Sequence, residues 1–209
     1  FYSGHHHSSL DAANRGIAQT PSSANGASTP TIVNRTGIPQ RPFDEIKNEV
    51  VDFVNGHWPE DVRTKESKII AIREFIDELN PKDLPKLFDI IKDMPDSTDK
   101  QLAMYVMLDY LASPEDNSTQ DFVNPLLALQ LLGNLTDPSE RKDLQALALR
   151  ELANDDPLKA LDALATLPPG SVDLIVYSEL FKSLAKQDPA KAAQLAEAMP
   201  AGKERLKAI

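Results

Sequence analysis

Three dipeptides of Asp or Asn followed by Pro recur at intervals of 32 residues, and this spacing constrains the fold more than any other feature. They are Asn124-Pro125, Asp156-Pro157 and Asp188-Pro189. An Asp or Asn side chain caps free N–H groups at a helix start, and Pro suits the first helical position because its missing N–H needs no partner there. A fourth dipeptide, Asn80-Pro81, stands upstream. The sequence therefore predicts helices that begin at regular intervals.

Apolar residues follow each of these starts in one register. They stand three, seven and ten residues after the Pro, and these offsets share one face of an α-helix. The residues are Ala128, Leu132 and Leu135, then Ala160, Leu164 and Leu167, then Ala192, Ala196 and Met199. Each of these helices ends in a turn, and a second helix is predicted after it. The apolar faces of these second helices are Leu144, Ala148 and Leu152, then Val176, Leu180 and Leu184.

The second copy also carries a capping-box-like pattern. Asp137 precedes Pro138, and Glu140 stands three residues after Asp137. In a capping box the first side chain bonds the N–H of the third helical residue, whose own side chain bonds back. The second helix of this copy is therefore predicted to begin at Pro138.

The copy that starts at Pro81 is longer, because Pro81 and Pro125 stand 44 residues apart, an excess of 12. We assign this excess to one additional helical turn before Met94 and to a polar insertion, "SPEDNSTQD", after Leu111. The helix between them, "DKQLAMYVMLDYLA", is apolar on nearly all sides and should be buried. Farther upstream, residues 43–55 and 65–79 predict one more helix pair, with Ile69, Ile72, Ile76 and Leu79 on one face.

The predicted fold class is all-α, a right-handed α-solenoid of antiparallel helix pairs with a repeat of about 32 residues. One pair cannot bury its own apolar face, and stacked copies build a continuous core. The repeat domain spans residues 43–209. Its helix pairs are expected at 43–79, 81–113, 124–154, 156–186 and 188–209.

Residues 1–42 predict an extended N-terminal arm. The stretch is rich in Ser, Thr, Asn, Gly and Pro and has no helical or strand period. Its opening, "FYSGHHHSS", has two interpretations: the remnant of an affinity tag, or the end of a removed membrane anchor or signal segment. His5, His6 and His7 are not assigned a metal, because neighbouring histidines in a flexible arm lack a second shell of ligand partners.

The stretch "LANDDPLKALDALATLPPG" resembles the second helix of tetratricopeptide repeats, with its central Ala and closing Pro. Its period is 32 residues rather than about 34, and the Trp, Gly and Tyr signature of the first helix is missing. The pattern is more similar to degenerate Asp-Pro, Ala, Leu-Pro repeats in large uncharacterised bacterial envelope proteins. This resemblance covers residues 80–209. It implies protein–protein scaffolding and supplies no catalytic residues.

The charge of the chain bears on its partners. The net charge is −10, with about +2 on residues 1–42 and about −12 on the remainder. An acidic helical domain lacks the clustered Lys and Arg that nucleic-acid binding requires. The acidic helix ends favour a basic protein partner.

The residue types for catalysis are sparse. The chain has no Cys, and His57, in "NGHWPE", is the only His outside the arm. We expect His57 to be a surface loop residue and Asp156 to be a helix cap. No metal, cofactor or catalytic residue is predicted, and the protein is not expected to be an enzyme. An enzyme reading would require a deep pocket with strongly perturbed carboxylates.

Two places are candidates for partner contact. Trp58 is the only Trp; it is read as an amphipathic plug of the first helix pair or as a contact anchor, since Trp is enriched at binding hot spots. The insertion, residues 112–123, carries Glu115, Asp116 and Asn117. Insertions in solenoids often lie on a binding face, although a polar surface loop also costs little free energy.

The function we predict is a non-enzymatic protein–protein interaction scaffold, or an assembly subunit of a larger membrane-associated complex. The alternative is a helical accessory region of a larger envelope enzyme whose catalytic domain lies elsewhere. The resemblance favours a bacterial periplasmic or envelope location. Membrane contact is expected only through an N-terminal anchor, since no run of apolar residues approaches the length of a membrane span.

Overall fold

The computed structural model of the chain describes residues 39–112, 123–168, 170–199 and 201–208, without the side chains of Glu204, Leu206 and Lys207. Contacts divide the chain into two units, Phe1–Pro30 and Thr31–Ile209, and all described residues belong to the second. Within the described ranges the chain is helical and forms no β-strand, so the predicted all-α class is confirmed. The expected arm lies almost entirely outside these ranges and stays a prediction.

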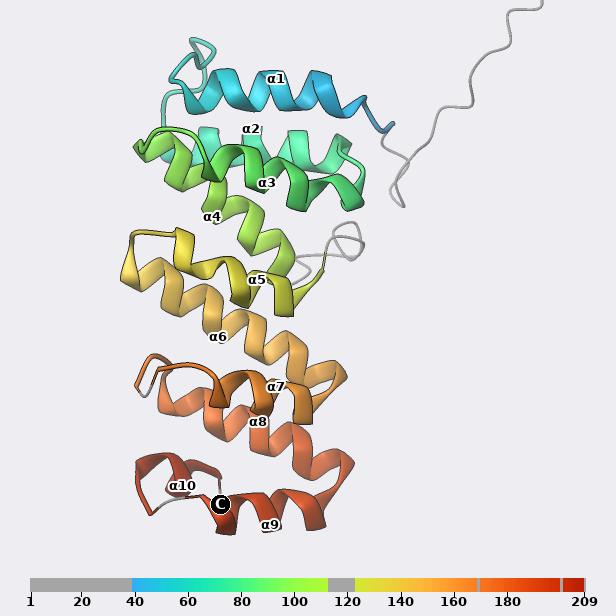
Figure 1. Cartoon of the computed structure of the whole chain (residues 1–209), viewed down its shortest axis with the longest axis vertical. Helices are drawn as coiled ribbons and strands as arrows, with labels where there is room; N and C mark the ends of the chain where they lie inside the picture. Colours follow the sequence, from blue (N-terminus) through green and yellow to red (C-terminus); the bar gives the residue numbers. More distant parts are fainter. Residues whose placement is uncertain (1–38, 113–122, 169, 200, 209) are drawn as a thin grey trace, which may run out of the picture. The chain divides into compact units, whose positions relative to one another are not determined.

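The helices follow one another along the chain and are labelled in Figure 1. Their bounds are α1 Phe43–Val54, α2 Lys65–Glu78, the 3₁₀ turn η1 Pro81–Asp83, α3 Leu84–Lys92, α4 Thr98–Ala112, α5 Pro125–Leu131, the 3₁₀ turn η3 Leu132–Asn134, α6 Pro138–Asp155, α7 Pro157–Ala165, α8 Leu174–Gln187, α9 Pro189–Ala198 and α10 Lys203–Ala208. The additional turn expected before Met94 is the 3₁₀ turn η1, which precedes α3. The insertion after Leu111 lies largely outside the described residues.

The four Asx-Pro dipeptides start helices, as predicted. Each Asp or Asn side chain accepts a hydrogen bond from a backbone N–H two or three residues later, which satisfies a donor that the first turn leaves free. The donor–acceptor distances lie between 2.9 and 3.2 Å. The side chains are Asn80, Asn124, Asp156 and Asp188.

Two of these residues act at both ends of consecutive helices. Asp156 ends α6 and caps α7, and Asp188 ends α8 and caps α9. Their backbone angles nearly coincide, with φ −141° and ψ 91° at Asp156 and φ −144° and ψ 89° at Asp188. Each N–H closes the helix before it, on Leu152 and Leu184 respectively. One residue therefore makes the whole connection between two helices.

The capping-box-like pattern predicted at the start of α6 is found only in part: Asp137 caps the helix, but Glu140 does not bond back. Asp137 accepts from the N–H groups of Ser139 at 2.7 Å and Glu140 at 3.2 Å. The Glu140 side chain does not return to Asp137; it pairs with Lys65 Nζ of α2 at 3.3 Å. A reciprocal capping box occurs instead at the start of α2, between Thr64 and Ser67. Glu140 and Lys65 stand 75 residues apart in the sequence, so the local capping pattern could not predict that they pair.

The long helices pack against one another in chain order. Helix α4 packs on α2 and α6, α6 packs on α4 and α8, and α10 packs on α8. The shorter helices α3, α5, α7 and α9 pack on these long helices more than on one another. Figure 1 shows the resulting alternation of short and long helices.

The apolar register is confirmed at most of its positions. The alanines three residues after each Pro are buried, and so are the residues seven positions after it. Helix α4 is buried on nearly all sides, as expected. At the tenth position Leu135 is buried, whereas Leu167 and Met199 are only half-buried. These two side chains border open grooves, described below.

Candidate functional site

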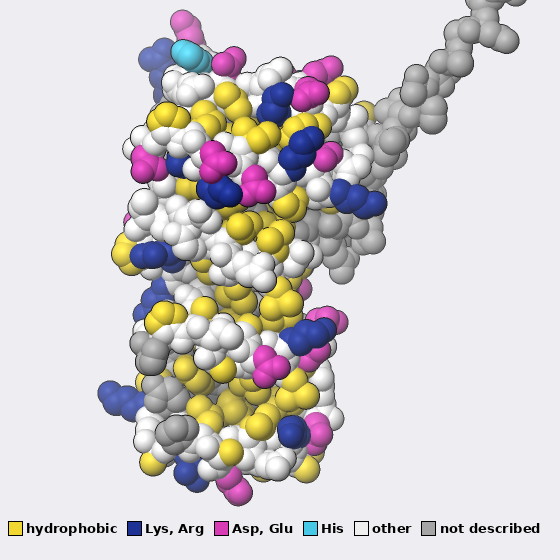
Figure 2. Space-filling model, viewed as in Figure 1, with side chains coloured by type: hydrophobic (Ala, Val, Ile, Leu, Met, Phe, Trp, Pro, Cys, Tyr) yellow, Lys and Arg dark blue, Asp and Glu magenta, His cyan; other side chains and the backbone are white. Residues whose placement is uncertain are grey.

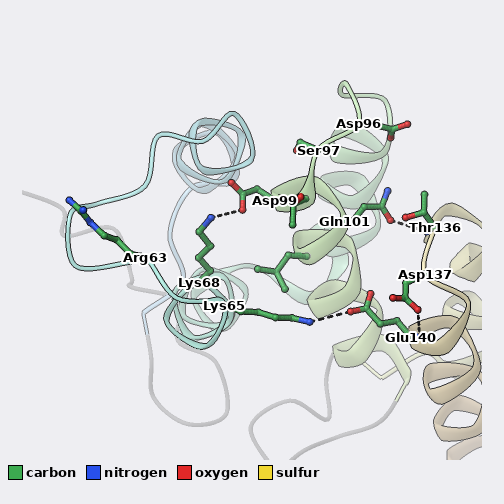
Figure 3. A pocket seen from close by; sticks show the side chains of 12 residues that line it. Arg63, Lys65, Lys68, Asp96, Ser97, Asp99, Gln101, Thr136, Asp137 and Glu140 are labelled. Carbon is green, nitrogen blue, oxygen red and sulfur yellow. Dashed lines mark hydrogen bonds and ion pairs between the residues drawn. The ribbon is translucent and has the colours of Figure 1, made fainter.

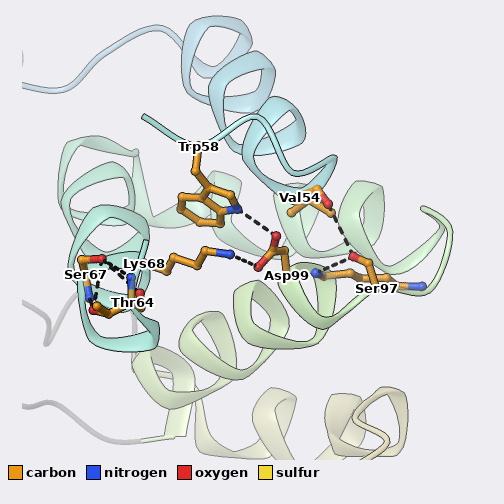
Figure 4. A network of polar contacts seen from close by, with 8 residues as sticks. Val54, Trp58, Thr64, Ser67, Lys68, Ser97 and Asp99 are labelled. Atoms are coloured by element: carbon orange, nitrogen blue, oxygen red, sulfur yellow. Dashed lines mark hydrogen bonds and ion pairs between the residues drawn. The ribbon is translucent and has the colours of Figure 1, made fainter. Parts of the chain in front are cut away.

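Trp58 lies in the loop between α1 and α2 and packs inward (Figure 4). Its Nε1 donates to Asp99 Oδ2 of α4 at 2.8 Å, and its ring centroid lies 4.6 Å from that of Phe53. Lys68 of α2 places Nζ 4.7 Å from the Trp58 ring centroid and 2.6 Å from Asp99 Oδ1. The indole thus joins three elements, which supports the plug interpretation. Its role as a partner anchor stays a prediction.

The N-terminal ends of α2, α4 and α6 enclose a polar cleft of about 690 Å³ (Figure 3). Cations and carboxylates face each other across it. Lys65 pairs with Glu140, and Lys68 pairs with Asp99. Gln101 Oε1 accepts from the N–H of Thr136 at 2.9 Å, which fastens α4 to the turn before α6. These contacts hold the N-terminal ends of three helices together.

The cleft offers little chemistry. In the described part of the chain, no group of three or more His, Cys, Asp or Glu side chains is arranged to hold a metal ion. His57 is 74% exposed, as predicted for a loop residue, and its nearest carboxylate, Asp52, is 3.9 Å away. Of the described carboxyl groups, Asp44 and Asp156 have lowered pKa values, through hydrogen bonds from Lys47 and Lys159 respectively. A general acid would need a raised pKa.

A second kind of surface lies between the short helices. A groove of about 570 Å³ separates α7 from α9, with Leu161, Phe181 and Met199 among the side chains that line it. A groove of about 520 Å³, called the α5–α7 groove below, lies over α6 between the end of α5 and the segment that follows α7, and it includes Leu129 and Leu167. Figure 2 shows apolar side chains gathered along this face, over α5, α7 and α9. Both volumes lie in the range typical of ligand pockets.

Half-exposed leucines accompany these grooves at equivalent repeat positions. Leu126 and Leu158 each follow the first Pro of a helix, and they are 40% and 43% exposed. Single exposed apolar residues are common on proteins, but here Leu158 lines the α7–α9 groove and Leu126 repeats its exposure at the equivalent position of α5. We therefore take the face built by α5, α7 and α9, with its two grooves, as the candidate functional site.

The remaining predicted contact residues, Glu115, Asp116 and Asn117, lie outside the described residues, as do His5, His6 and His7. Two residues of α6 that border the α5–α7 groove, Arg141 and Gln145, were not predicted from the sequence. Gln145 carried a signal, because it interrupts an apolar stripe at Leu144, Ala148 and Leu149. Arg141 carried none, because its surroundings come from residues far along the chain.

Comparisons with protein-family models, with curated proteins and with solved structures return no match for this chain. No helix in the described part is long and apolar enough to span a membrane.

Proposed function

We propose that residues 43–209 form an α-solenoid of tetratricopeptide-like repeats that serves as a protein–protein interaction scaffold. The observation that carries this proposal is the open apolar face of α5, α7 and α9. Leu158 lines the α7–α9 groove, and Leu126 is half-exposed at the same repeat position on α5. Apolar grooves between helices suit amphipathic segments of a partner, which bury their apolar side chains there.

The alternative site, the polar cleft, favours the same conclusion. Its charged side chains form ion pairs between helices, Lys65 with Glu140 and Lys68 with Asp99. Residues committed to such pairs stabilise the junction and are poorly placed to bind or transform a substrate. The cleft therefore contributes rigidity, and the apolar face contributes recognition.

The test compares partner capture by two variants of the full 209-residue chain. The variant L126E/L158E places carboxylates on the apolar face, at positions exposed enough for the fold to be retained. Ile70→Glu is the matched control, because Ile70 is 57% exposed on α2, away from this face. Each protein is immobilised and exposed to an extract of the source cells, and bound proteins are quantified by mass spectrometry.

We expect at least one protein to be captured stoichiometrically by the wild type and by Ile70→Glu, and about tenfold less by L126E/L158E. Thermal unfolding followed by circular dichroism verifies that all three proteins are folded. A wild-type partner set that L126E/L158E retains in full would contradict the assignment of the face. The absence of any specific partner would contradict the scaffold function itself.

A further inference from the structure

The groove between α5 and α7 contains an arginine without a counter-charge. Arg141 of α6 is half-buried at this groove, and its guanidinium has no ion pair or hydrogen bond with the described residues. The neighbouring Lys142 differs, because its Nζ lies 2.6 Å from Asp173 Oδ1. No Asp or Glu of the described ranges lines the groove. The groove is thus locally cationic within a chain whose net charge is −10.

The same groove contains a polar side chain that is only half satisfied. Gln145 is 7% exposed, and its Nε2 donates to Ser171 Oγ at 3.2 Å. Its carboxamide oxygen accepts no hydrogen bond from the described part of the chain. This oxygen is not one of the fully buried side-chain atoms, so a bound segment can reach it and donate an N–H to it.

The walls of the groove are apolar and leave room. Leu129, Leu132 and Leu167 line it, and Leu132 is nearly fully buried. Gly133 also lines it, and a Cβ added there would meet no atom within 4 Å. On the α5 side the lining runs only from Leu129 to Gly133, which suits a short segment better than a long helix.

We propose that the α5–α7 groove binds a short amphipathic segment of a partner protein that carries an acidic residue beside apolar side chains. The apolar side chains fill the space between Leu129 and Leu167. The carboxylate pairs with Arg141, whose planar guanidinium accommodates two parallel hydrogen bonds. An N–H of the segment donates to the Gln145 oxygen.

This inference rests on the proposed scaffold function and adds the chemistry of the partner. It also opposes the expectation of a basic partner, which followed from the acidic helix ends. The net charge governs long-range approach, whereas the charge inside a half-buried groove governs the residue bound there, because burial reduces screening.

The experiment selects binders from a phage-displayed library of random 16-residue peptides on the full 209-residue protein, with counter-selection on Gly133→Phe. Phe at position 133 would occupy the groove without a steric clash at Cβ. Selected peptides are synthesised with a fluorophore, and their affinities are measured by fluorescence anisotropy. The affinity panel comprises wild type, Arg141→Gln, Gly133→Phe and Arg63→Gln. Arg63→Gln is the matched control, because it removes one arginine charge at the polar cleft instead.

We expect the selected peptides to share apolar residues spaced three or four apart and at least one Asp or Glu. Arg141→Gln should weaken binding about tenfold or more, the range of a charge-assisted hydrogen bond. Gly133→Phe should abolish binding, and Arg63→Gln should leave it unchanged. Replacing the acidic residue of the peptide with its amide should weaken binding to wild type but not to Arg141→Gln.

Three results would overturn the proposal. Peptides that lack acidic residues and bind equally to wild type and Arg141→Gln would contradict the proposed pairing of a partner carboxylate with Arg141. Peptides that bind Gly133→Phe as well as wild type would place the site elsewhere. A concentration-dependent dimer in sedimentation velocity that Gly133→Phe disrupts would assign the groove to a second copy of the chain. If cell-extract partners are lost in L126E/L158E but retained by Gly133→Phe, the scaffold function stands and only this groove assignment fails.

Discussion

Two regions of the described chain pack their helices with different kinds of buried side chain. In residues 39–112 the core consists of large side chains such as Phe88, Ile76 and Met104, and polar tethers cross between helices. In residues 138–208 the helix contacts depend more on alanines, including Ala160 and Ala192. The first region is irregular in sequence and tightly filled. The second is regular in sequence and leaves grooves between its short helices.

This difference shows where repetition is useful. A small residue at a fixed position lets each short helix approach the long helices at the same distance, so one sequence pattern suffices for every copy. Large and irregular side chains fill the core of the first region, and the cleft of about 690 Å³ at its edge is polar and crossed by ion pairs. The regular region therefore keeps an open face, at some cost in packing, and the irregular region supplies a well-packed block beside it.

Removal of a large side chain should separate the regions most clearly. Phe88 is fully buried in α3, so Phe88→Ala should lower the free energy of unfolding by about 3–5 kcal/mol. Leu164 of α7 lines the α7–α9 groove, so Leu164→Ala should cost about 2–3 kcal/mol because solvent can enter the space left behind. Urea unfolding followed by far-UV circular dichroism measures both. Equal losses would contradict the contrast in packing.

Enlargement of a small side chain tests the second region directly. Ala160 is fully buried on α7, so Ala160→Leu should force α7 away from its neighbours and cost about 2 kcal/mol. Ala165 lies on the same helix but is exposed, so Ala165→Leu should be nearly neutral. Urea unfolding of both variants provides the comparison. A neutral Ala160→Leu would mean that the alanine does not set the helix spacing.

Loss of a tether should matter more in the first region. Asp99→Asn weakens the bonds of Lys68 and Trp58, both at partly buried side chains, and should cost about 1.5 kcal/mol. The emission of Trp58, the only Trp, should shift to longer wavelength as its ring gains solvent. In the second region Asp173→Asn breaks an exposed pair with Lys142 and should cost less than about 0.5 kcal/mol. The two costs are compared by urea unfolding, and the reverse order would contradict this view of the tethers.

A helix cap should have a smaller effect. Asp137 accepts two backbone N–H groups at the start of α6, so Asp137→Ala should cost about 1 kcal/mol. Asp143→Ala removes the same charge from an exposed position on the same helix and should have almost no effect. Thermal unfolding of the two variants separates capping from net charge. Equal shifts in Tm would show that charge alone matters.

The smallest effect is the titration of Asp156. Hydrogen bonds from Lys159, first from its backbone N–H and then from its side chain, lower the pKa of this carboxyl below its ordinary value of 3.8. Because the folded-state pKa is lower than the unfolded one, the carboxylate contributes stability above the unfolded value. That contribution is lost as the pH falls through the folded value. An NMR titration should place its midpoint below 3.8, and a midpoint at or above that value would contradict the cap geometry.

The sequence predicted the parts of the fold that depend on neighbouring residues. Helix starts at Asn124, Asp156 and Asp188 and the buried alanines after them follow from local capping and helical periodicity, and the structure confirms them. The solenoid and its family stay a proposal. The additional helical turn expected before Met94 is a 3₁₀ turn, because Pro85 in the first turn of α3 has no N–H to donate to the Pro81 carbonyl.

The candidate site was predicted poorly, for a physical reason. Arg141 lines the same groove as Leu129 and Leu167, which lie 12 residues before it and 26 residues after it. These residues come together only when the helices pack, so the local sequence could not predict the groove. The pairing of Lys68 with Asp99 spans 31 residues in the same way. Trp58 was recognised by its residue type, but only its contact with Asp99 distinguishes a plug from an exposed anchor.

The double role of Asp156 and Asp188 has a consequence for how such a chain evolves. Each is the C-cap of one helix and the N-cap of the next, with nearly the same backbone angles. Excision of residues 157–188 would join Asp156 to Pro189 and recreate the same Asp-Pro junction, and a duplicated block would insert another. Recombination at these codons changes the number of modules and creates no new loop. The face built by α5, α7 and α9 can therefore be lengthened or shortened by whole units while every junction keeps its geometry.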